Sequence, residues 1–274
     1  MLVEPEALEA DLGLPELRVI DATWYLPAHG RDAREEYARD HLPGAIYLDL
    51  STDLADGQAP VRNTLAAPSA LARTFARAGI GSAHRVVVYD RLGGFSAARV
   101  WWALRYAGHP NPALLNGGYA RWLAEGRALT ADVPRLPEAD FAAAPQAQLL
   151  ALKQDVVRAV AAGDTAIVDA RSLERFRGTD PEPTRHQGHI PGSACVPYAR
   201  NLDEGLGIRK RDELREIYEA AGVRFDRPVI TTCGSGVSAS LNAFVLLLLG
   251  HSDVRVYDGS WAEWGNADDV PHSR

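Results

Sequence analysis

A cysteine flanked by glycines is the part of this sequence best suited to chemistry. The run CGSG at residues 233–236 follows a β-branched segment, residues 228–232, and precedes a helical pattern over residues 235–249. This order places the sulfur of Cys233 at the carboxyl end of a strand and the N-terminus of a helix. Unpaired N–H groups and the helix dipole favour an anion there, and Gly234 and Gly236 let the backbone curl around it. The loop therefore predicts a nucleophilic thiolate, and the same cradle suits a persulfide anion.

Competing roles for this loop fit its residues less well. A buried cysteine at a strand end is often only a small apolar residue, but plain packing does not need the surrounding glycines. A cysteine phosphatase needs an arginine where Ala239 stands, and a serine hydrolase needs Gly-x-Ser-x-Gly, whereas Ser235 lies directly between two glycines. The second cysteine, Cys195, has no neighbouring glycine nest, so we expect it to line the core or a strand.

The composition describes a globular chain of 274 residues with 46% hydrophobic residues and a formal net charge of −7. The net negative charge and the lack of a basic run argue against nucleic-acid binding. The apolar stretch at residues 243–249 is too short to span a membrane, and the acidic N-terminus is unlike a signal peptide. From these two features we expect a cytoplasmic protein. Two cysteines are too few for a disulfide framework or a typical zinc site, and we expect no metal and no organic cofactor.

The second half of the chain repeats the first. His41-Leu42-Pro43-Gly44 reappears as residues 189–192 at an offset of 148, and NGGYARW at residues 116–122 reappears as DGSWAEW at an offset of 142. The change in offset means that the first copy carries about six extra residues, which we place in a surface loop around DLADGQAPVRNT. Because His41 and His189 occur in both copies, we expect them to fix turns.

In each copy, β-branched runs alternate with helical patterns. Residues 85–89 precede a helix over 96–107, and further helices are expected over 69–78, 153–161 and 212–221. This alternation is typical of an α/β fold with a mostly parallel sheet flanked by helices. We predict an N-terminal domain over residues 1–132, an extended proline-rich linker over 133–149, and a C-terminal catalytic domain over 150–274.

Together, these blocks resemble the tandem-domain sulfurtransferases of the rhodanese superfamily, and 3-mercaptopyruvate sulfurtransferase most closely. The resemblance rests on motifs along nearly the whole chain, namely DATWYLP, GRDAREEYARDHLPGA, RVWWALRYAGH, RFRGTDPEP, GHIPG, CGSGVSA and YDGSWAEWG. It implies two rhodanese-like domains of which only the second is active. In the first copy, VVVYD ends in Asp90 where the second has Cys233, so we expect the first domain to be catalytically silent.

The residues after the cysteine bear on the choice of sulfur donor. In this family, thiosulfate enzymes carry basic residues there, whereas mercaptopyruvate enzymes read CGSGVT, and this chain has Val237 and Ser238 in a loop with no cation. A monoanionic keto acid is therefore the better physical match. We expect the loop residues Gly234, Gly236, Val237 and Ser238 to contact the substrate, and Ser235 to orient or protonate it.

The resemblance also implies two arginines that hold the donor's carboxylate and keto oxygen. Arg175 matches the first in RFRGT, and Arg185 falls near the second, after an intruding Thr184. Animal mercaptopyruvate enzymes add an Asp and a His that act through the loop serine; Ser51 and Asn63 fall near those places here, which argues against such a relay.

The expected function is transfer of sulfane sulfur from 3-mercaptopyruvate, through a persulfide on Cys233, to a thiol, thioredoxin or cyanide acceptor. Two alternatives stay open. One is a thiosulfate sulfurtransferase, and the other is a relay protein that accepts persulfide without turning over a small donor.

Overall fold

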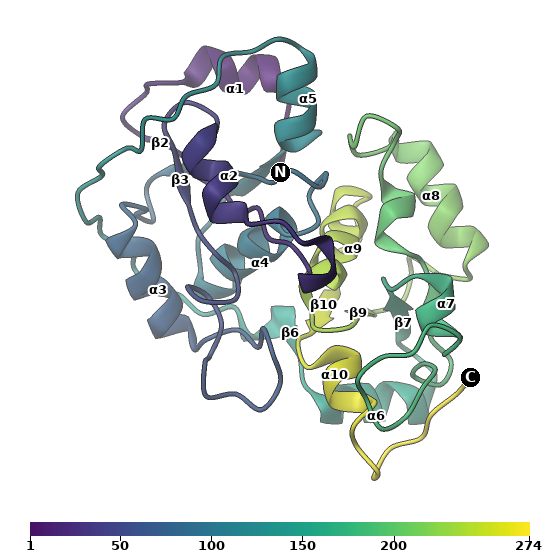
Figure 1. Ribbon diagram of the computed structural model, residues 1–274. Helices are drawn as coiled ribbons and strands as arrows, with labels where there is room; N and C mark the ends of the chain where they lie inside the picture. Colours follow the sequence, from purple (N-terminus) through teal and green to yellow (C-terminus); the bar gives the residue numbers. More distant parts are fainter. The chain divides into compact units, whose positions relative to one another are not determined.

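The computed structural model describes residues 1–274 and divides the chain into two compact units. The first unit comprises residues 1–57, 65–146 and 203–208, and the second comprises residues 58–64, 147–202 and 209–274. In Figure 1 the first unit is drawn mainly in purple to teal and the second mainly in green to yellow. Each unit therefore contains a short segment from the other half of the sequence.

The elements of the first unit alternate between strands and helices, as expected from the sequence. They are β1 (Leu2–Val3), α1 (Pro5–Asp11), β2 (Leu17–Asp21), the 3-10 helix η1 (Pro27–His29), α2 (Ala33–Arg39), β3 (Ala45–Tyr47), α3 (Pro68–Arg77), β4 (Arg85–Tyr89), α4 (Ala97–Ala107), β5 (Pro112–Leu115) and α5 (Gly118–Ala124).

The second unit repeats this order. Its elements are η2 (Ala147–Leu149), β6 (Leu150–Ala151), α6 (Lys153–Ala162), β7 (Ala166–Asp169), α7 (Leu173–Phe176), β8 (Ala194–Cys195), η3 (Tyr198–Asn201), α8 (Arg211–Ala220), β9 (Val229–Thr232), α9 (Val237–Leu248), β10 (Val254–Tyr257) and α10 (Ser260–Trp264). The predicted helices and strands agree with these bounds to within about two residues.

Each unit contains a five-stranded sheet in which every pairing is parallel. The strand orders, β1-β5-β4-β2-β3 and β6-β10-β9-β7-β8, are equivalent in the two copies. Because parallel strands need crossover connections, helices cover the sheet, and strands buried on both faces are rich in valine and isoleucine. In the second unit α9 packs against β9 and β10. The predicted α/β fold is confirmed, and all carboxyl ends of the strands lie at one edge of each sheet.

Large aromatic residues fill the cores. Trp101 and Trp102 on α4 and Trp261 and Trp264 on α10 are at most 1% exposed, so each removes a large apolar area from water. Trp122 in the first unit occupies the position that matches Trp264, and both lie in the cluster of buried residues of their unit. The tryptophans are therefore a main part of each core.

The two Pro-Gly turns are anchored in the same way. The Nδ1 atoms of His41 and His189 lie 2.7 and 3.0 Å from the carbonyl oxygens of Tyr37 and Phe176, and each imidazole stacks on that aromatic ring. This geometry fits the turn-fixing role expected from their repetition.

The predicted linker packs on the first unit through residue 146. The N–H groups of Ala139 and Ala144 donate to the carbonyl oxygens of Ala76 and Ala107, and Phe141 is 8% exposed beside Phe75. The segment is extended, as expected, but it is held by backbone hydrogen bonds and a buried ring. No helix in the chain has the length and hydropathy of a membrane span.

Candidate functional site

Cys233 lies between β9 and α9 and is 2% exposed. Its N–H and that of Gly236 both donate to the hydroxyl oxygen of Ser260, over 3.1 and 3.0 Å. The carbonyl oxygen of Cys233 accepts a hydrogen bond from the N–H of Trp261, and the carbonyl oxygen of Gly234 accepts one from the N–H of Ala262. The loop is thus clamped to the start of α10 at both ends, which fixes the direction of the cysteine side chain.

Inside this clamp, the loop leaves several N–H groups without a protein acceptor. Gly236 caps α9 with a φ of 76°, a left-handed conformation that glycine adopts without strain. The N–H groups of Gly234, Ser235, Val237 and Ser238 donate to no backbone or side-chain oxygen. Unpaired N–H groups at the start of a twelve-residue helix form a binding site for an anion.

The equivalent loop in the first unit shows what such a cradle holds. Asp90, at the position that matches Cys233, is 1% exposed, and its two carboxylate oxygens accept five hydrogen bonds. The donors are the N–H groups of Leu92, Gly94, Ser96 and Ala97 and the hydroxyl of Ser96, over 2.7 to 3.1 Å. A buried anion is therefore fully satisfied by this loop geometry. The loop of the first copy is therefore occupied by the side chain of Asp90.

Ser260 is the functional residue that the sequence analysis missed. It has a φ of 49°, an unusual left-handed conformation for a residue other than glycine. The matching residue of the first copy is Gly118, with a φ of 52°. The sequence feature that could have identified Ser260 is the change from glycine in the first copy to serine in the second. Serine at this position costs backbone strain, but its hydroxyl group holds the loop.

Arg175 lies against the cysteine loop. A Cβ atom on Gly234 would come within 2.7 Å of its Nη2 atom, so glycine at 234 is what allows the guanidinium to approach. The Arg175 side chain is 33% exposed, and its Nε donates to Glu182 over 2.6 Å. The structure therefore places a cation with free N–H groups beside the predicted nucleophile.

A buried ion network holds Arg175 in this position. Glu182, 8% exposed at its side chain, also accepts from Arg171, which is fully buried and paired with Asp169 over 2.7 Å. The Arg171 guanidinium lies over the ring of Trp261, 4.7 Å from its centre. Buried charges are stable only when they are paired and hydrogen-bonded. The network thus connects the end of β7, through Glu182, to Arg175.

Arg185 is placed differently from Arg175. Its side chain is 67% exposed and pairs with Asp268 over 2.7 Å, and its N–H donates to Asn266. The intruding Thr184 accepts a hydrogen bond from the indole of Trp261. Arg185 makes no hydrogen bond to the cysteine loop, so the geometry supports Arg175 more strongly as a substrate residue.

Ser235 and Asn63 come together within the second unit, which includes residues 58–64. The Nδ2 of Asn63 lies 3.3 Å from the Oγ of Ser235 and donates to it. Asn63 is 8% exposed and has a φ of 61°. An amide side chain can orient this hydroxyl but has no titratable proton to relay. Ser51 instead hydrogen-bonds Asp49 and Trp24 in the first unit.

Cys195 is chemically unlike Cys233. Burial, followed by the nearby charge of Asp169, raises the pKa of the Cys195 thiol to about 12. Cys195 is in β8, and its sulfur lies 3.7 Å from the carbonyl oxygen of Arg171. A thiol with this pKa carries almost no thiolate at neutral pH, which fits its expected structural role.

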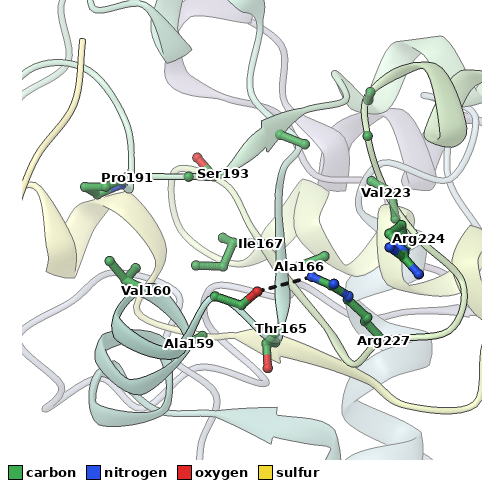
Figure 2. Close-up of a pocket in the computed structure, with 15 residues that line it drawn as sticks. Ala159, Val160, Thr165, Ala166, Ile167, Pro191, Ser193, Val223, Arg224 and Arg227 are labelled. Atoms are coloured by element: carbon green, nitrogen blue, oxygen red, sulfur yellow. Dashed lines mark hydrogen bonds between the residues drawn. The ribbon is translucent and has the colours of Figure 1, made fainter.

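A cavity of about 310 Å³ in the second unit lies away from this site. It is lined by the start of β7, including Ala166 and Ile167, and by Ser193, Arg224 and Arg227 (Figure 2). Arg227 donates to the carbonyl oxygen of Gly163. Because β7 and β9 are parallel, this cavity is at the opposite edge of the sheet from Cys233. None of its lining residues belongs to the cysteine loop.

Comparison with known proteins identifies relatives over most of the chain. The model of the rhodanese-like domain matches residues 4–125 and 152–267. The human 3-mercaptopyruvate sulfurtransferase is 38% identical over 263 residues, covering 94% of this chain and 88% of the relative. The Bos taurus thiosulfate sulfurtransferase is 38% identical over 264 residues, with the same coverage.

Solved structures agree with this result. The crystal structure of the 3-mercaptopyruvate sulfurtransferase SseA from Escherichia coli matches with a TM-score of 0.88 and 34% identity, covering 95% of this chain and 98% of that one. The yeast Tum1 protein matches with the same TM-score at 28% identity, covering 96% of this chain and 94% of that one. Among the sequence relatives, the human enzyme named for mercaptopyruvate and the Bos taurus enzyme named for thiosulfate are both 38% identical to this chain.

Proposed function

Since this chain belongs to the rhodanese-like family and is a sulfurtransferase, we propose that its donor is 3-mercaptopyruvate and that its sulfur carrier is Cys233. The main observation in support of this proposal is the structure of the loop at residues 233–238. The loop that carries Cys233 has N–H groups without a protein acceptor, the Ser260 hydroxyl lies 4.0 Å from the Cys233 sulfur, and the equivalent loop in the first unit encloses a carboxylate.

The first half-reaction forms the persulfide. The thiolate of Cys233 attacks the donor sulfur, a sulfur–sulfur bond forms, and the carbon–sulfur bond breaks with its electron pair on carbon. Pyruvate leaves as its enolate and takes up a proton, which the ionising persulfide releases. The loop N–H groups stabilise the sulfur anion, as donors aimed at developing charge do in an oxyanion hole.

Arg175 has the matching role toward the organic part of the donor. Its guanidinium, fixed by Glu182, offers the remaining N–H groups to the carboxylate and keto oxygen of mercaptopyruvate. Charge on the keto oxygen grows as the enolate departs, so this interaction strengthens in the transition state. Ser235, oriented by Asn63, is the hydroxyl nearest in sequence to the reacting sulfur. We assign it to orienting the donor.

In the second half-reaction, an acceptor attacks the outer sulfur of the persulfide and releases the Cys233 thiolate. A thiol, thioredoxin or cyanide all have the required nucleophile, and cyanide would yield thiocyanate. We place this turnover in the cytoplasm because both cysteines are free thiols, a state that a reducing compartment maintains.

The choice of donor rests on charge. The side chains at residues 234–238 carry no cation, and Arg175, already paired with Glu182, is the cation found against the loop. Thiosulfate, a dianion, would be only partly neutralised there. Thiosulfate remains the second candidate because relatives named for it are equally similar.

Steady-state kinetics with both donors, using one enzyme preparation and one acceptor, tests the donor. We expect kcat/KM for mercaptopyruvate to exceed that for thiosulfate by about 10-fold or more, on the scale of one charge-assisted hydrogen bond. A higher value for thiosulfate would overturn the assignment. Mass spectrometry after mixing with mercaptopyruvate should show one added sulfur on Cys233; its absence would favour a relay protein.

A matched pair of arginine substitutions tests the binding residues. Arg175→Ala should lower kcat/KM by about 10- to 100-fold, the effect of losing charge-assisted hydrogen bonds. Arg185→Ala should have a much smaller effect, because this side chain is exposed and paired with Asp268. If Arg185→Ala lowered kcat/KM as much as Arg175→Ala, Arg185 would also belong to the substrate site.

A further inference from the structure

A second cleft, in the first unit, has a different chemistry from the cysteine loop. It has a volume of about 410 Å³ and is formed by α2, β3, the end of α3 and the extended segment at residues 133–136. This volume is in the range of small-molecule sites. All the lining residues belong to the first unit, and none takes part in the proposed sulfur transfer.

Three arginines line this cleft. Arg34 is on α2, Arg77 is in the last turn of α3, and Arg135 is on the extended segment. No aspartate or glutamate lines the cleft, and none of the three guanidinium groups forms an ion pair with a carboxylate. Although the chain has a net charge of −7, this cleft therefore contains three guanidinium groups that no carboxylate neutralises.

Most other exposed arginines in this chain pair with a carboxylate or donate a hydrogen bond to a backbone carbonyl oxygen. In the cavity at the start of β7, Arg224 pairs with Asp226 over 2.6 Å, and Arg227 donates to Gly163. The helix C-terminus explains a positive charge at Arg77, but it does not explain why Arg34 and Arg135 line the same cleft. Three unpaired guanidinium groups match the chemistry of a multiply charged anion.

The rest of the lining is apolar and aromatic. The Arg34 guanidinium lies over the ring of Tyr47, 4.9 Å from its centre, which forms a flat surface in the cleft. Ile46 and Leu136 also line it, and Val133 is 60% exposed there. The hydroxyl of Tyr47 is already bonded to the carbonyl oxygen of Thr23, so Tyr47 offers its ring. An inorganic anion would leave this apolar surface unused.

We propose that this cleft binds an organic phosphate, a small molecule that joins a phosphate or polyphosphate group to a ring. The guanidinium groups of Arg77 and Arg135 hold the phosphate oxygens, and the flat surface of Arg34 stacked on Tyr47, together with Val133 and Leu136, receives the ring of the ligand. The site is separate from Cys233 and takes a ligand chemically unlike the sulfur donor.

Isothermal titration calorimetry with ATP, AMP and pyrophosphate as probes tests the proposal. We expect ATP to bind the full-length protein with a Kd below about 1 mM, and we expect higher salt to weaken it, as screening requires. The double variant Arg77→Ala/Arg135→Ala should weaken ATP binding at least about 10-fold. Arg224→Ala, which removes an exposed arginine elsewhere, should leave it unchanged.

Each outcome decides the proposal. No heat of binding for ATP or AMP at millimolar concentrations, or equal binding by the double variant, would overturn it. Pyrophosphate binding as tight as ATP binding would also overturn it, because the ring would then contribute nothing. Sulfur-transfer rates and melting temperatures of the variants should equal those of the wild type, which verifies that a lost signal reflects the cleft and not misfolding.

Discussion

At the scale of single residues, the site depends on what each backbone position permits. Gly234 leaves room for Arg175, Gly236 caps α9 with a positive φ, and Ser260 accepts a left-handed conformation to bring its hydroxyl to two loop N–H groups. Asn63 has a similar φ and directs its amide to Ser235. The Cys233 loop, which carries the proposed nucleophile, is therefore held by residues to which the proposed reaction assigns no bond-making step.

Cysteine substitution and labelling separate the two thiols. Cys233→Ser should lower sulfur transfer at least about 1,000-fold, because the attacking thiolate is removed. Cys195→Ser should retain activity. The pKa of Cys195, raised to about 12, means that its thiolate fraction stays small until the pH approaches that value, so iodoacetamide at pH 8 should leave it unmodified. Alkylation of native Cys195 at pH 8, measured by peptide mass spectrometry, would contradict this.

Two substitutions at Ser260 separate its hydroxyl group from its backbone strain. Ser260→Gly and Ser260→Ala both remove the acceptor for the N–H groups of Cys233 and Gly236, so both should lower kcat. Only alanine keeps the strain at a φ of 49°, so Ser260→Ala should be less stable than Ser260→Gly by about 1 kcal/mol. Urea unfolding measures the difference; equal stability would show that this backbone position carries no strain.

Glu182 is a positioning residue that acts through Arg175. Glu182→Gln keeps the shape of the side chain but removes the charge that both Arg175 and the buried Arg171 contact. We expect KM for mercaptopyruvate to rise about 10-fold, with a smaller change in kcat, because Arg175 loses its fixed orientation. Persulfide formed on Cys233 from a small neutral polysulfide donor should be unaffected. An equal loss with both donors would indicate a merely structural role.

At the scale of elements, the two copies show one strand–loop–helix unit used in two ways. The N–H groups of the first loop enclose the carboxylate of Asp90, the residue after β4. The matching N–H groups after Cys233 have no protein acceptor. The amide-lined turn before α4 and α9 is therefore an anion site in each case. In the first unit the anion is part of the protein and contributes to stability.

Asp90→Asn tests this structural role. The substitution places an NH₂ group against loop donors in a site that is 1% exposed, and buried donors without an acceptor are costly. We expect the free energy of unfolding to fall by roughly 3 kcal/mol, measured by denaturant titration. The control Asp226→Asn removes an exposed pair with Arg224 and should change stability far less than Asp90→Asn does, because solvent screens exposed ion pairs. A similar result for both variants would contradict the cradle.

At the scale of the whole molecule, the two copies share one fold but differ in the residues at their loops. The second unit has Cys233 and Arg175, while the first has Asp90 and carries the extra loop that follows β3. Part of that loop, residues 58–64, belongs to the second unit. The insertion seen as a change in repeat offset therefore supplies Asn63, which neither domain of the simple repeat would provide.

Asn63→Gly tests the contribution of this loop. Glycine retains the positive φ of 61° but removes the amide that donates to Ser235. We expect kcat/KM to fall about 3- to 10-fold, in line with the loss of one hydrogen bond between neutral groups. Stability should change little. Unchanged kinetics would show that the orientation of Ser235 does not matter for turnover.

The sequence by itself determined the α/β fold and the duplication, because these follow from local periodicity and from motifs repeated at a fixed offset. Cys233 as the nucleophile, Arg175 as the donor-binding arginine and the catalytic silence of the first copy stay predictions that rest on those motifs. Only the tertiary structure decided that Ser260 clamps the loop, that Glu182 orients Arg175, and that Arg185 pairs with Asp268. Those contacts join residues far apart in the chain, and they depend on strand order, loop course and side-chain direction, which no local pattern encodes.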